Sequence, residues 1–186
     1  MTEYYGRQIA KLYDRLEHNP SDALVASAYR QFKAEIMEQY ELLRYCGITV
    51  VMASENPYPT SLHMFNDIRI GYLVVYTGGT LPGDHPLAEP MIVGKLFTMS
   101  YNVAFRAIHD YFGHYVGQNG FGPIGENGAF IEHRQMFSEL AVRALTTETR
   151  GQNSWFNFGP HSDKPVDVRP FAEQKAGLLP VWVSRV

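Results

Sequence analysis

Apolar side chains recur at helical spacing between residues 19 and 47, and this pattern predicts one long amphipathic helix. Asn19 is expected to cap its start, because an asparagine side chain can accept a hydrogen bond from the first turn. Pro20 suits that turn, Asp22 favours the positive end of the helix dipole, and Gly47 is the expected stop signal. The predicted buried face consists of Val25, Tyr29, Phe32, Ile36, Tyr40 and Leu43.

Two short runs rich in β-branched residues follow, and they predict strands at residues 48–54 and 70–79. Between them, residues 61–68 fit one or two turns of helix. Residues 78–95 contain three prolines, which interrupt both helices and strands. This stretch is therefore expected to form a flexible loop that could close over a site.

The second half of the chain is mainly helical in its pattern. One helix is predicted from about residue 96 to 116 and another from about 129 to 146, joined by a glycine-rich connector. Residues 151–169 are polar and aromatic, and they are expected to form a second flexible loop. A short helix is predicted over residues 169–180, and the tail that follows is expected to be an edge strand or an extended arm.

The composition supports a single folded domain over residues 1–186. With 45% hydrophobic and 13% aromatic residues, the chain can bury a sizeable core. The order of the predicted elements indicates a mainly α fold of the α+β kind. We expect a helical core with a small sheet of two or three strands.

Charge and cysteine content narrow the classes of partner and compartment. The formal net charge of −3 gives no bulk attraction to nucleic acid, although a local basic groove stays open as an alternative. The single cysteine, Cys46, excludes an internal disulfide framework and a cysteine-rich zinc site, and it fits a reducing compartment. No apolar run approaches the roughly 20 residues of a membrane span, and the N-terminus lacks the apolar core of a signal peptide. We therefore expect a cytoplasmic protein with no membrane partner.

Two histidines and an aspartate interrupt the apolar pattern of the predicted helix over residues 96–116. His109, Asp110 and His114 stand among large apolar side chains, where a polar group costs free energy unless something satisfies it. On an α-helix Asp110 and His114 share one face, because they are four residues apart. His109 neighbours Asp110 around the helix, so the three side chains could bind one ion.

The next predicted helix adds further groups of the same kind. His133 falls on its apolar face, Glu132 borders that face, and Glu126 lies just before the helix. Helices joined by a short connector often pack antiparallel. Such packing would bring these groups towards His109 and Asp110.

Imidazole and carboxylate ligands suit a divalent metal ion such as zinc, iron or manganese. An open coordination position would hold a water molecule, and Glu132 or Glu126 could act as its general base. Asp110 could instead orient a ligand. The alternative is a buried hydrogen-bond network that fixes helix packing without metal. The predicted metal ligands are His109, Asp110, His114 and His133.

A further group of polar residues follows the helix predicted over residues 129–146. Arginine suits phosphate or carboxylate groups, and asparagine and glutamine suit amides or base edges. The stretch could line a substrate pocket, and it could also simply end the helix at Arg150 and Gly151. The predicted substrate-binding residues are Glu148, Arg150, Gln152 and Asn153. Outside the helices, His85 is the best candidate for an extra metal ligand.

Several sequence blocks together resemble an uncharacterised family found in phages and some bacteria. The likeness spans roughly residues 19 to 180. It implies a phage or mobile-element setting, and hence the host cytoplasm, but it assigns no activity. The blocks are NPSDALVASAYRQFKAE, FRAIHDYFGH, GENGAFIEHRQMFS, ALTTETRGQNSW and FAEQKAGLLP.

A shorter stretch, AFRAIHDYFGH, is similar to the metal-binding helix of HD-domain metal-dependent phosphohydrolases. This resemblance implies that His109 and Asp110 form the metal-binding pair. It also implies an earlier histidine and a later aspartate as outer ligands. The candidates are His63 or His85 for the first, and Asp163 or Asp167 for the second.

The candidate site leads us to expect a metal-dependent enzyme, in the first place a hydrolase of a phosphate ester, a nucleotide or a related small molecule. A non-haem iron oxygenase would use a similar set of ligands. A non-enzymatic phage accessory or binding protein would instead keep the polar network without a metal.

Overall fold

The computed structural model describes residues 2–79, 81–93 and 97–185, and the fold is mainly helical. The α-helices are α1 (Glu3–Asp14), α2 (Ala23–Tyr45), α3 (Ser61–Arg69), α4 (Tyr101–Ile108), α5 (Pro123–His133), α6 (Glu139–Thr146) and α7 (Gln152–Phe158). The strands are β1 (Thr49–Ala53), β2 (Tyr72–Tyr76), β3 (Pro90–Val93) and β4 (Phe97–Ser100). The predicted mainly α fold with a small sheet is confirmed, but the strands form two separate pairs.

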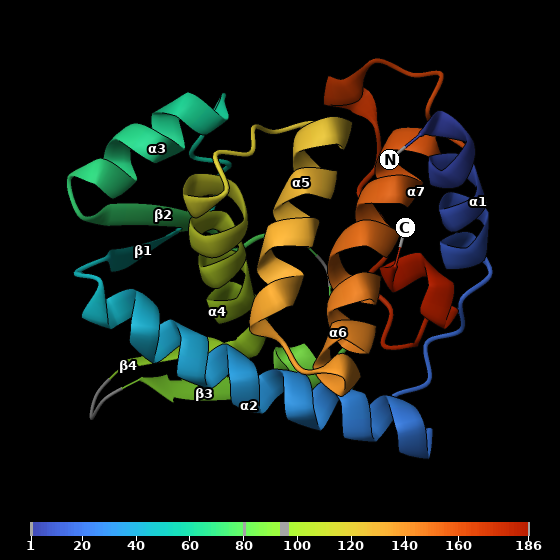
Figure 1. Ribbon diagram of the computed structural model, residues 1–186, viewed down its shortest axis with the longest axis horizontal. Helices are drawn as coiled ribbons and strands as arrows, with labels where there is room; N and C mark the ends of the chain where they lie inside the picture. Colours follow the sequence, from blue (N-terminus) through green and yellow to red (C-terminus); the bar gives the residue numbers. More distant parts are fainter. Residues whose placement is uncertain (1, 80, 94–96, 186) are drawn as a thin grey trace.

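The long helix α2 organises the main core. It runs along one side of the molecule, and α4, α5 and α6 stand across it (Figure 1). Every residue of the predicted apolar face of α2 is buried, and the helix packs mainly on α4 and α6. At its centre the Phe32 ring contacts the rings of Phe105 and Phe137, with centroids 5.0 and 5.1 Å away. Within the described residues, no helix is both long and apolar enough to cross a membrane.

The capping of α2 differs from the prediction. Asp22, not Asn19, caps the helix, because its carboxylate accepts hydrogen bonds from the N–H groups of Leu24 and Val25, both at 3.0 Å. The Asn19 side chain instead accepts a hydrogen bond from a neighbouring serine hydroxyl. Gly47 ends the helix as predicted, with a φ of +80° that favours glycine.

A small βαβ unit lies at one end of the molecule. β1 and β2 pair in parallel, with Thr49 opposite Tyr72 and Ala53 opposite Tyr76, and α3 connects them (Figure 1). β3 and β4 form a separate antiparallel pair. The end of β2 matters for the site, because it lies beside α4.

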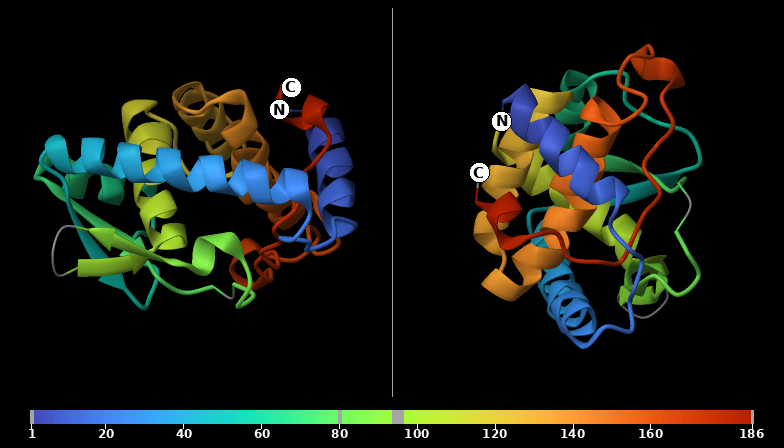
Figure 2. Two further views of the ribbon diagram at one scale, coloured as in Figure 1. Left: turned by 90° about the horizontal axis from the view of Figure 1, so that it is seen from below. Right: turned by 90° about the vertical axis from the view of Figure 1, so that its right-hand side faces the viewer.

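The opposite end is closed by α1 and the C-terminal segment. α1, which the sequence analysis did not predict, packs on α7. Ile9 and Tyr13 of α1 form a second apolar cluster with Leu179 and Val183. Both ends of the described chain therefore lie at the same end of the molecule (Figure 2).

The prediction of a single helix over residues 129–146 is wrong, because α5 and α6 are separate. Phe137 has an extended backbone, and Ser138 caps α6 by accepting a hydrogen bond from the N–H of Ala141. The N–H of Ser138 in turn donates to the Glu35 carboxylate on α2, at 2.9 Å. This contact from a distant helix holds the break, and local sequence patterns do not reveal it.

Two of the predicted loops contain regular structure. The predicted loop over residues 78–95, part of which lies outside the described residues, includes a short 3₁₀ turn at Pro86–Ala88 and then β3. The predicted loop over residues 151–169 begins with α7. The tail forms a 3₁₀ turn at Val181–Ser184 rather than a strand or an extended arm.

The predicted helix over residues 169–180 is also wrong, because this segment has no regular structure. Its carbonyl groups bind side chains of other elements instead. The Tyr13 hydroxyl donates to the carbonyl of Glu173, and the Thr147 hydroxyl donates to the carbonyl of Gly177, both at 2.8 Å. Tertiary hydrogen bonds thus replace those of a helix.

Candidate metal centre

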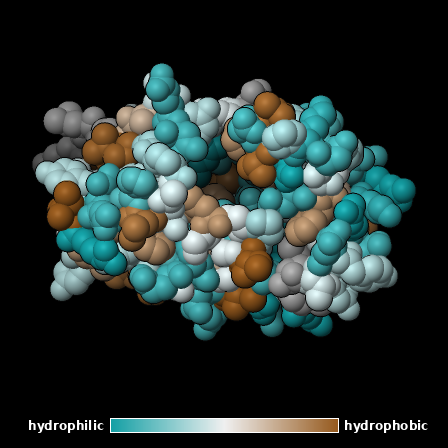
Figure 3. Space-filling model, turned by 90° about the horizontal axis from the view of Figure 1, so that it is seen from above, coloured by the Kyte–Doolittle hydropathy of each residue, from teal (hydrophilic) through white to brown (hydrophobic). Residues whose placement is uncertain are grey.

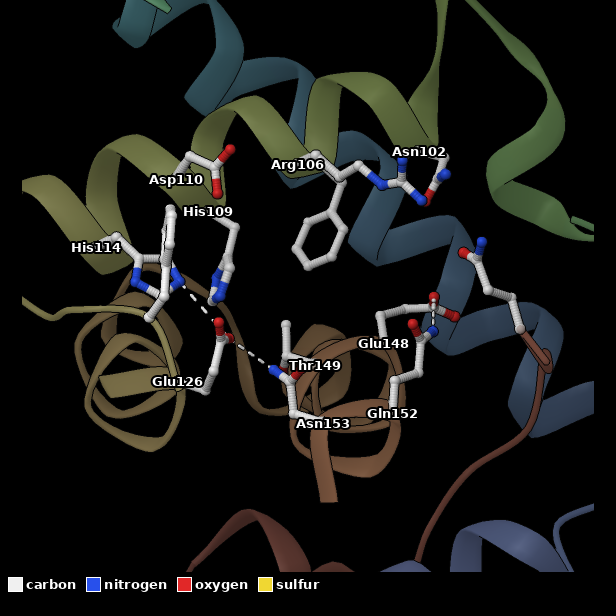
Figure 4. Close-up of a pocket in the computed structure, with 13 residues that line it drawn as sticks. Asn102, Arg106, His109, Asp110, His114, Glu126, Glu148, Thr149, Gln152 and Asn153 are labelled. Atoms are coloured by element: carbon white, nitrogen blue, oxygen red, sulfur yellow. Dashed lines mark hydrogen bonds and ion pairs between the residues drawn. The ribbon is translucent and has the colours of Figure 1, made fainter. Parts of the chain in front are cut away.

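Two segments of the described part of the chain are π-helical, and residues of both line one cavity of about 180 Å³. The first π-helix, His109–Val116, continues α4, and the second, Thr147–Gly151, joins α6 to α7. The predicted α-helix over residues 96–116 is therefore α-helical only in α4. π-Helices are rare and occur frequently at functional sites. Figure 4 shows the cavity between these segments.

The π-helical turn determines which side chains meet. In an α-helix His109 and His114 would lie roughly 140° apart, since each residue turns the helix by about 100°. In a π-helix the hydrogen bonds span five residues, so a spacing of five places two side chains on nearly the same face. The two imidazole rings are accordingly 5.2 Å apart. The expected pairing of Asp110 with His114 assumed α-helical geometry, whereas the structure pairs His109 with His114.

The side chains of His109, His114 and Glu126 converge on one point (Figure 4). One nitrogen of each histidine and one carboxylate oxygen lie within 4.8 Å of one another. Glu126 Oε2 is 3.6 Å from His114 Nε2. Glu126 comes from the first turn of α5, which packs on the first π-helix. The sequence predicts a general base at Glu126, whereas its position makes it the third candidate ligand.

A chain of hydrogen bonds fixes the protonation of His109. Gln39 on α2 donates its amide N–H to the carbonyl of Met136, so its amide oxygen accepts from His133 Nε2–H, 2.8 Å away. His133 then has a lone pair on Nδ1, which accepts the Nδ1–H of His109 at 3.0 Å. The remaining nitrogen of His109, Nε2, is buried and has no hydrogen-bond partner among the described residues. His109 therefore presents a lone pair to the cavity, as a metal ligand must.

His133, a predicted ligand, is not placed to bind the ion. Both of its ring nitrogens are used, by His109 and Gln39. Burial, together with the nearby charge of His114, lowers the pKa of His133 to about 3. His133 stays neutral and acts as a positioning residue for His109. Its ring is enclosed by three aromatic side chains, Phe105, Phe112 and Phe137.

His114 is oriented from its other side. Its Nδ1–H donates to the carbonyl of Asn119 at 3.0 Å, and the Asn119 amide donates to the carbonyl of Gly113 at 2.9 Å. This arrangement leaves Nε2 facing Glu126. Burial alone would lower the pKa of His114, but the carboxylates of Glu126 and Asp110 outweigh burial and raise the pKa to about 9. Without an ion, His114 and Glu126 therefore form an ion pair.

Glu126 is held by α7. The side-chain amide of Asn153 donates to Glu126 Oε2 at 2.7 Å, and both residues line the cavity. Each of the three candidate ligands therefore has a second partner that sets its orientation, which is the usual arrangement around protein metal ions.

Asp110 lines the same cavity but lies outside the group of three. Among the described residues, its carboxylate has no hydrogen-bond partner. Burial raises the pKa of Asp110 to about 6, with the charges of His114 and Arg106 opposing this shift and that of Glu126 adding to it. A carboxyl group with a pKa near neutrality, close to a metal-bound water, can accept a proton.

A second set of polar groups lies at the other end of the cavity. Glu148, from the second π-helix, accepts hydrogen bonds from the Tyr29 hydroxyl and from the Gln152 amide. The buried His85 accepts a backbone N–H at Nδ1, and its Nε2 lies 3.3 Å from Glu148 with no hydrogen-bond partner among the described residues. His85 therefore contacts Glu148 and is not part of the candidate metal group. Glu148 and Gln152 both line the cavity.

Two predicted site residues face away from the cavity. Glu132 is exposed on α5 and does not line it. Arg150 donates to the carbonyl of Val183 at 2.8 Å and to the side chain of Asn127 at 2.6 Å, and it lies over the ring of Phe130. Arg150 thus fastens the C-terminal segment, and its position does not support the expected role in substrate binding.

The outer ligands implied by the HD-domain likeness also lie elsewhere. His63 is exposed and hydrogen-bonds to Thr60. Asp163 and Asp167 are exposed and do not line the cavity. Of that implied set, only His109 and Asp110 line the cavity.

Sequence reasoning missed several residues that line the cavity, among them Asn102, Arg106 and Gln174. Asn102 and Arg106 precede Asp110 by two turns and one turn of the same helical rod, so helical spacing from the His–Asp pair was a usable signal. Gln174 comes from the segment without regular structure, and no local pattern places it there.

Comparison with known proteins assigns neither a family nor a function to this chain. No family model, curated protein or solved structure matches this chain. The function therefore has to be inferred from the geometry and chemistry of the cavity.

Replacing His133 with phenylalanine should weaken binding of divalent metal by about 10- to 100-fold, because His109 then loses the partner that fixes its tautomer and ring orientation. Titration of the folded variant with Zn²⁺ measures this change. The same substitution at the exposed His63 is the matched control and should leave affinity unchanged. Equal affinities for the two variants would show that His133 only fills the core.

Proposed function

We propose that this protein is a metal-dependent enzyme, a hydrolase of a phosphate ester, a nucleotide or a related small molecule. His109, His114 and Glu126 would hold a divalent ion. Two histidines and one carboxylate that leave a coordination position open are a ligand set of catalytic zinc sites.

One observation carries the proposal: the buried Nε2 of His109 has no partner among the described residues, and His109 belongs to the group of possible ligands with His114 and Glu126. A buried nitrogen without a hydrogen bond costs free energy. A metal ion at this point would satisfy the nitrogen.

The chemistry follows from the open position. A metal ion lowers the pKa of bound water to about 7, which makes hydroxide available near neutral pH. Asp110, whose carboxylate lines the cavity, would take the proton. Arg106 and the second set of polar groups would hold the substrate on the other side.

A second function is favoured by the same ligand set. Two histidines and one carboxylate with open positions also bind non-haem Fe(II) in oxygenases. Metal identity separates the two functions. Activity restored by Zn²⁺ supports the hydrolase, and activity that requires Fe(II) and oxygen supports the oxygenase.

The non-enzymatic alternative rests on the ion pair between His114 and Glu126. If the cluster only fixes helix packing, its variants lose stability and the protein binds no metal. Elemental analysis of protein purified without a nickel column decides between the metal-dependent enzyme and the non-enzymatic alternative. Stoichiometric metal that is lost in a folded His109→Ala variant supports the enzyme, together with release of p-nitrophenol from p-nitrophenyl phosphate that chelator abolishes. Protein that stays free of metal after incubation with Zn²⁺, Mn²⁺ and Fe²⁺ contradicts the proposal.

Metal binding should release close to one proton per ion at pH 7. His114, with a pKa of about 9, is protonated in the metal-free protein and must lose that proton to become a ligand. Affinity should therefore rise about tenfold per pH unit below pH 9, since protons compete with the metal. Calorimetry in two buffers with different ionisation enthalpies counts the released protons. Affinity that does not change between pH 6 and pH 8 would contradict a ligand role for His114.

A further inference from the structure

The cavity of about 180 Å³ at the candidate metal centre, the inner cavity, adjoins a larger cavity of about 540 Å³, the outer cavity. Arg106, Asp110 and Glu126 line both. The outer cavity lies by the N-terminal end of α5 and the C-terminal end of α7. Figure 3 shows a hollow near the middle of the face seen from above, the side on which these two helix ends lie in Figure 1. The outer cavity falls within the range of about 300–1,000 Å³ of small-molecule sites.

Aromatic rings surround the outer cavity. Tyr76, Phe121, Phe156 and Phe171 line it. Phe171 is 77% exposed, although its ring stacks on that of Phe156 with a centroid distance of 5.6 Å and an interplanar angle of 16°. Phe121 also lines the inner cavity, where its ring lies edge-on to His114. Open aromatic faces of this kind bind planar ring systems, including nucleobases.

Three carboxamide side chains of α7 line the outer cavity, and each uses its amide nitrogen as a donor within the protein. The amide nitrogens of Gln152 and Asn153 donate to the carboxylates of Glu148 and Glu126, and that of Asn157 donates to a backbone carbonyl. Because these partners can only accept, the orientation of each amide is fixed. The three side-chain oxygens accept no hydrogen bond from any described residue. They can therefore accept from the N–H groups of a ligand.

Arg106 supplies a positive charge where the two cavities join. One terminal nitrogen, Nη1, donates to the carbonyls of Tyr76 and Gly78, both at 2.7 Å. These two bonds hold the guanidinium in place, and its other nitrogens donate to no described residue. Arg106 precedes His109 by three residues, so their Cα atoms are roughly 4–5 Å apart along the helix axis. A phosphoryl group could contact both the guanidinium and an ion held by His109.

From these contacts we infer that the substrate is a nucleotide whose base carries an exocyclic amino group. The base would lie among the aromatic rings and donate N–H groups to the carboxamide oxygens, and the phosphoryl group would lie between Arg106 and the metal. This inference rests on the proposed function, because it uses the same ion.

Equilibrium binding of 5′-AMP, 5′-UMP and ribose 5-phosphate to the full chain tests the inference. 5′-AMP should bind with one-to-one stoichiometry and at least about tenfold more tightly than ribose 5-phosphate, because the base adds stacking. It should also bind more tightly than 5′-UMP, because uracil carries carbonyl groups and no exocyclic amino group that could donate to the carboxamide oxygens. Equal binding of 5′-AMP and 5′-UMP would overturn the amino-base assignment, and equal binding of 5′-AMP and ribose 5-phosphate would overturn the whole inference.

The variant Phe171→Ala locates the base. It should weaken 5′-AMP binding at least about fivefold and leave ribose 5-phosphate binding unchanged. Phe171 is exposed, so this variant should fold. Tyr45→Ala removes an aromatic ring that is 89% exposed and lines neither cavity, and it is the matched control. Unchanged 5′-AMP binding in Phe171→Ala would contradict the proposed position of the base.

Repeating the titrations in chelator separates this inference from the proposed function. The preference for 5′-AMP over ribose 5-phosphate should persist without metal, because the base contacts involve no ion. Metal binding without that preference would contradict the inference that the substrate is a nucleotide, but it would not contradict the proposed metal-dependent enzyme. The preference without any metal binding would keep the base site and overturn both the hydrolase and the proposed place of the phosphoryl group.

Discussion

Replacing Glu126 with glutamine should weaken binding of divalent metal by at least about 100-fold and abolish hydrolysis. Glutamine keeps the shape of the side chain but removes the negative charge, so two neutral imidazoles alone would face the ion. Changes to residues that merely orient a ligand already cost 10- to 100-fold in affinity, and the loss of a ligand should cost at least as much. Metal affinity is measured by competition with a chromophoric chelator.

The matched control is Glu132→Gln on the same helix. Glu132 is exposed and does not line the cavity, so this variant removes an equal charge from α5 without touching the candidate centre. Wild-type affinity in Glu132→Gln with strongly reduced affinity in Glu126→Gln supports the assignment. Strongly reduced metal affinity in Glu132→Gln with wild-type affinity in Glu126→Gln would make Glu132 the functional carboxylate and contradict the geometry.

Replacing Gly125 with alanine should lower the free energy of unfolding by roughly 2–3 kcal/mol. A Cβ at this position would lie 1.7 Å from the carbonyl oxygen of Gly120, a backbone atom that can move only if the connector into α5 moves. For a chain of this size, the loss corresponds to a melting temperature about 5–10 °C lower. Because Gly125 adjoins Glu126, metal affinity should fall as well.

Gly83→Ala is the control for this prediction. A Cβ at Gly83 meets no atom within 4 Å, and its φ lies outside the left-handed region. Its melting temperature should therefore equal or slightly exceed that of the wild type, as is usual where alanine fits the backbone. If Gly125→Ala is as stable as Gly83→Ala, the connector is not packed against α5 as described.

The strongly patterned parts of the fold could be predicted from the sequence. The buried face of α2 and the strands β1 and β2 follow from periodicity and β-branched runs, which are local properties. The break between α5 and α6 could not be predicted, because a hydrogen bond from Glu35 on a distant helix holds it. The irregular segment before Pro180 likewise depends on tertiary contacts, including the Tyr13 hydroxyl bond to the chain at Glu173.

The candidate site was only partly predictable, for the same reason. The residue types singled out His109, Asp110 and His114, and all three line the cavity. Their grouping depended on helix type, because only the π-helical turn places His109 and His114 on one face. The position of His133 between His109 and Gln39 could not be read from the sequence, since α2 supplies one of those partners.

The central claim is that His109, His114 and Glu126 share one cation. Anomalous diffraction from crystals grown with Zn²⁺, recorded on both sides of the zinc absorption edge, tests this most directly. We predict a single strong peak about 2.0–2.2 Å from a nitrogen of each histidine and from a Glu126 oxygen. A peak elsewhere, or an ion-free contact between His114 and Glu126 in crystals that hold zinc at other sites, would contradict the account.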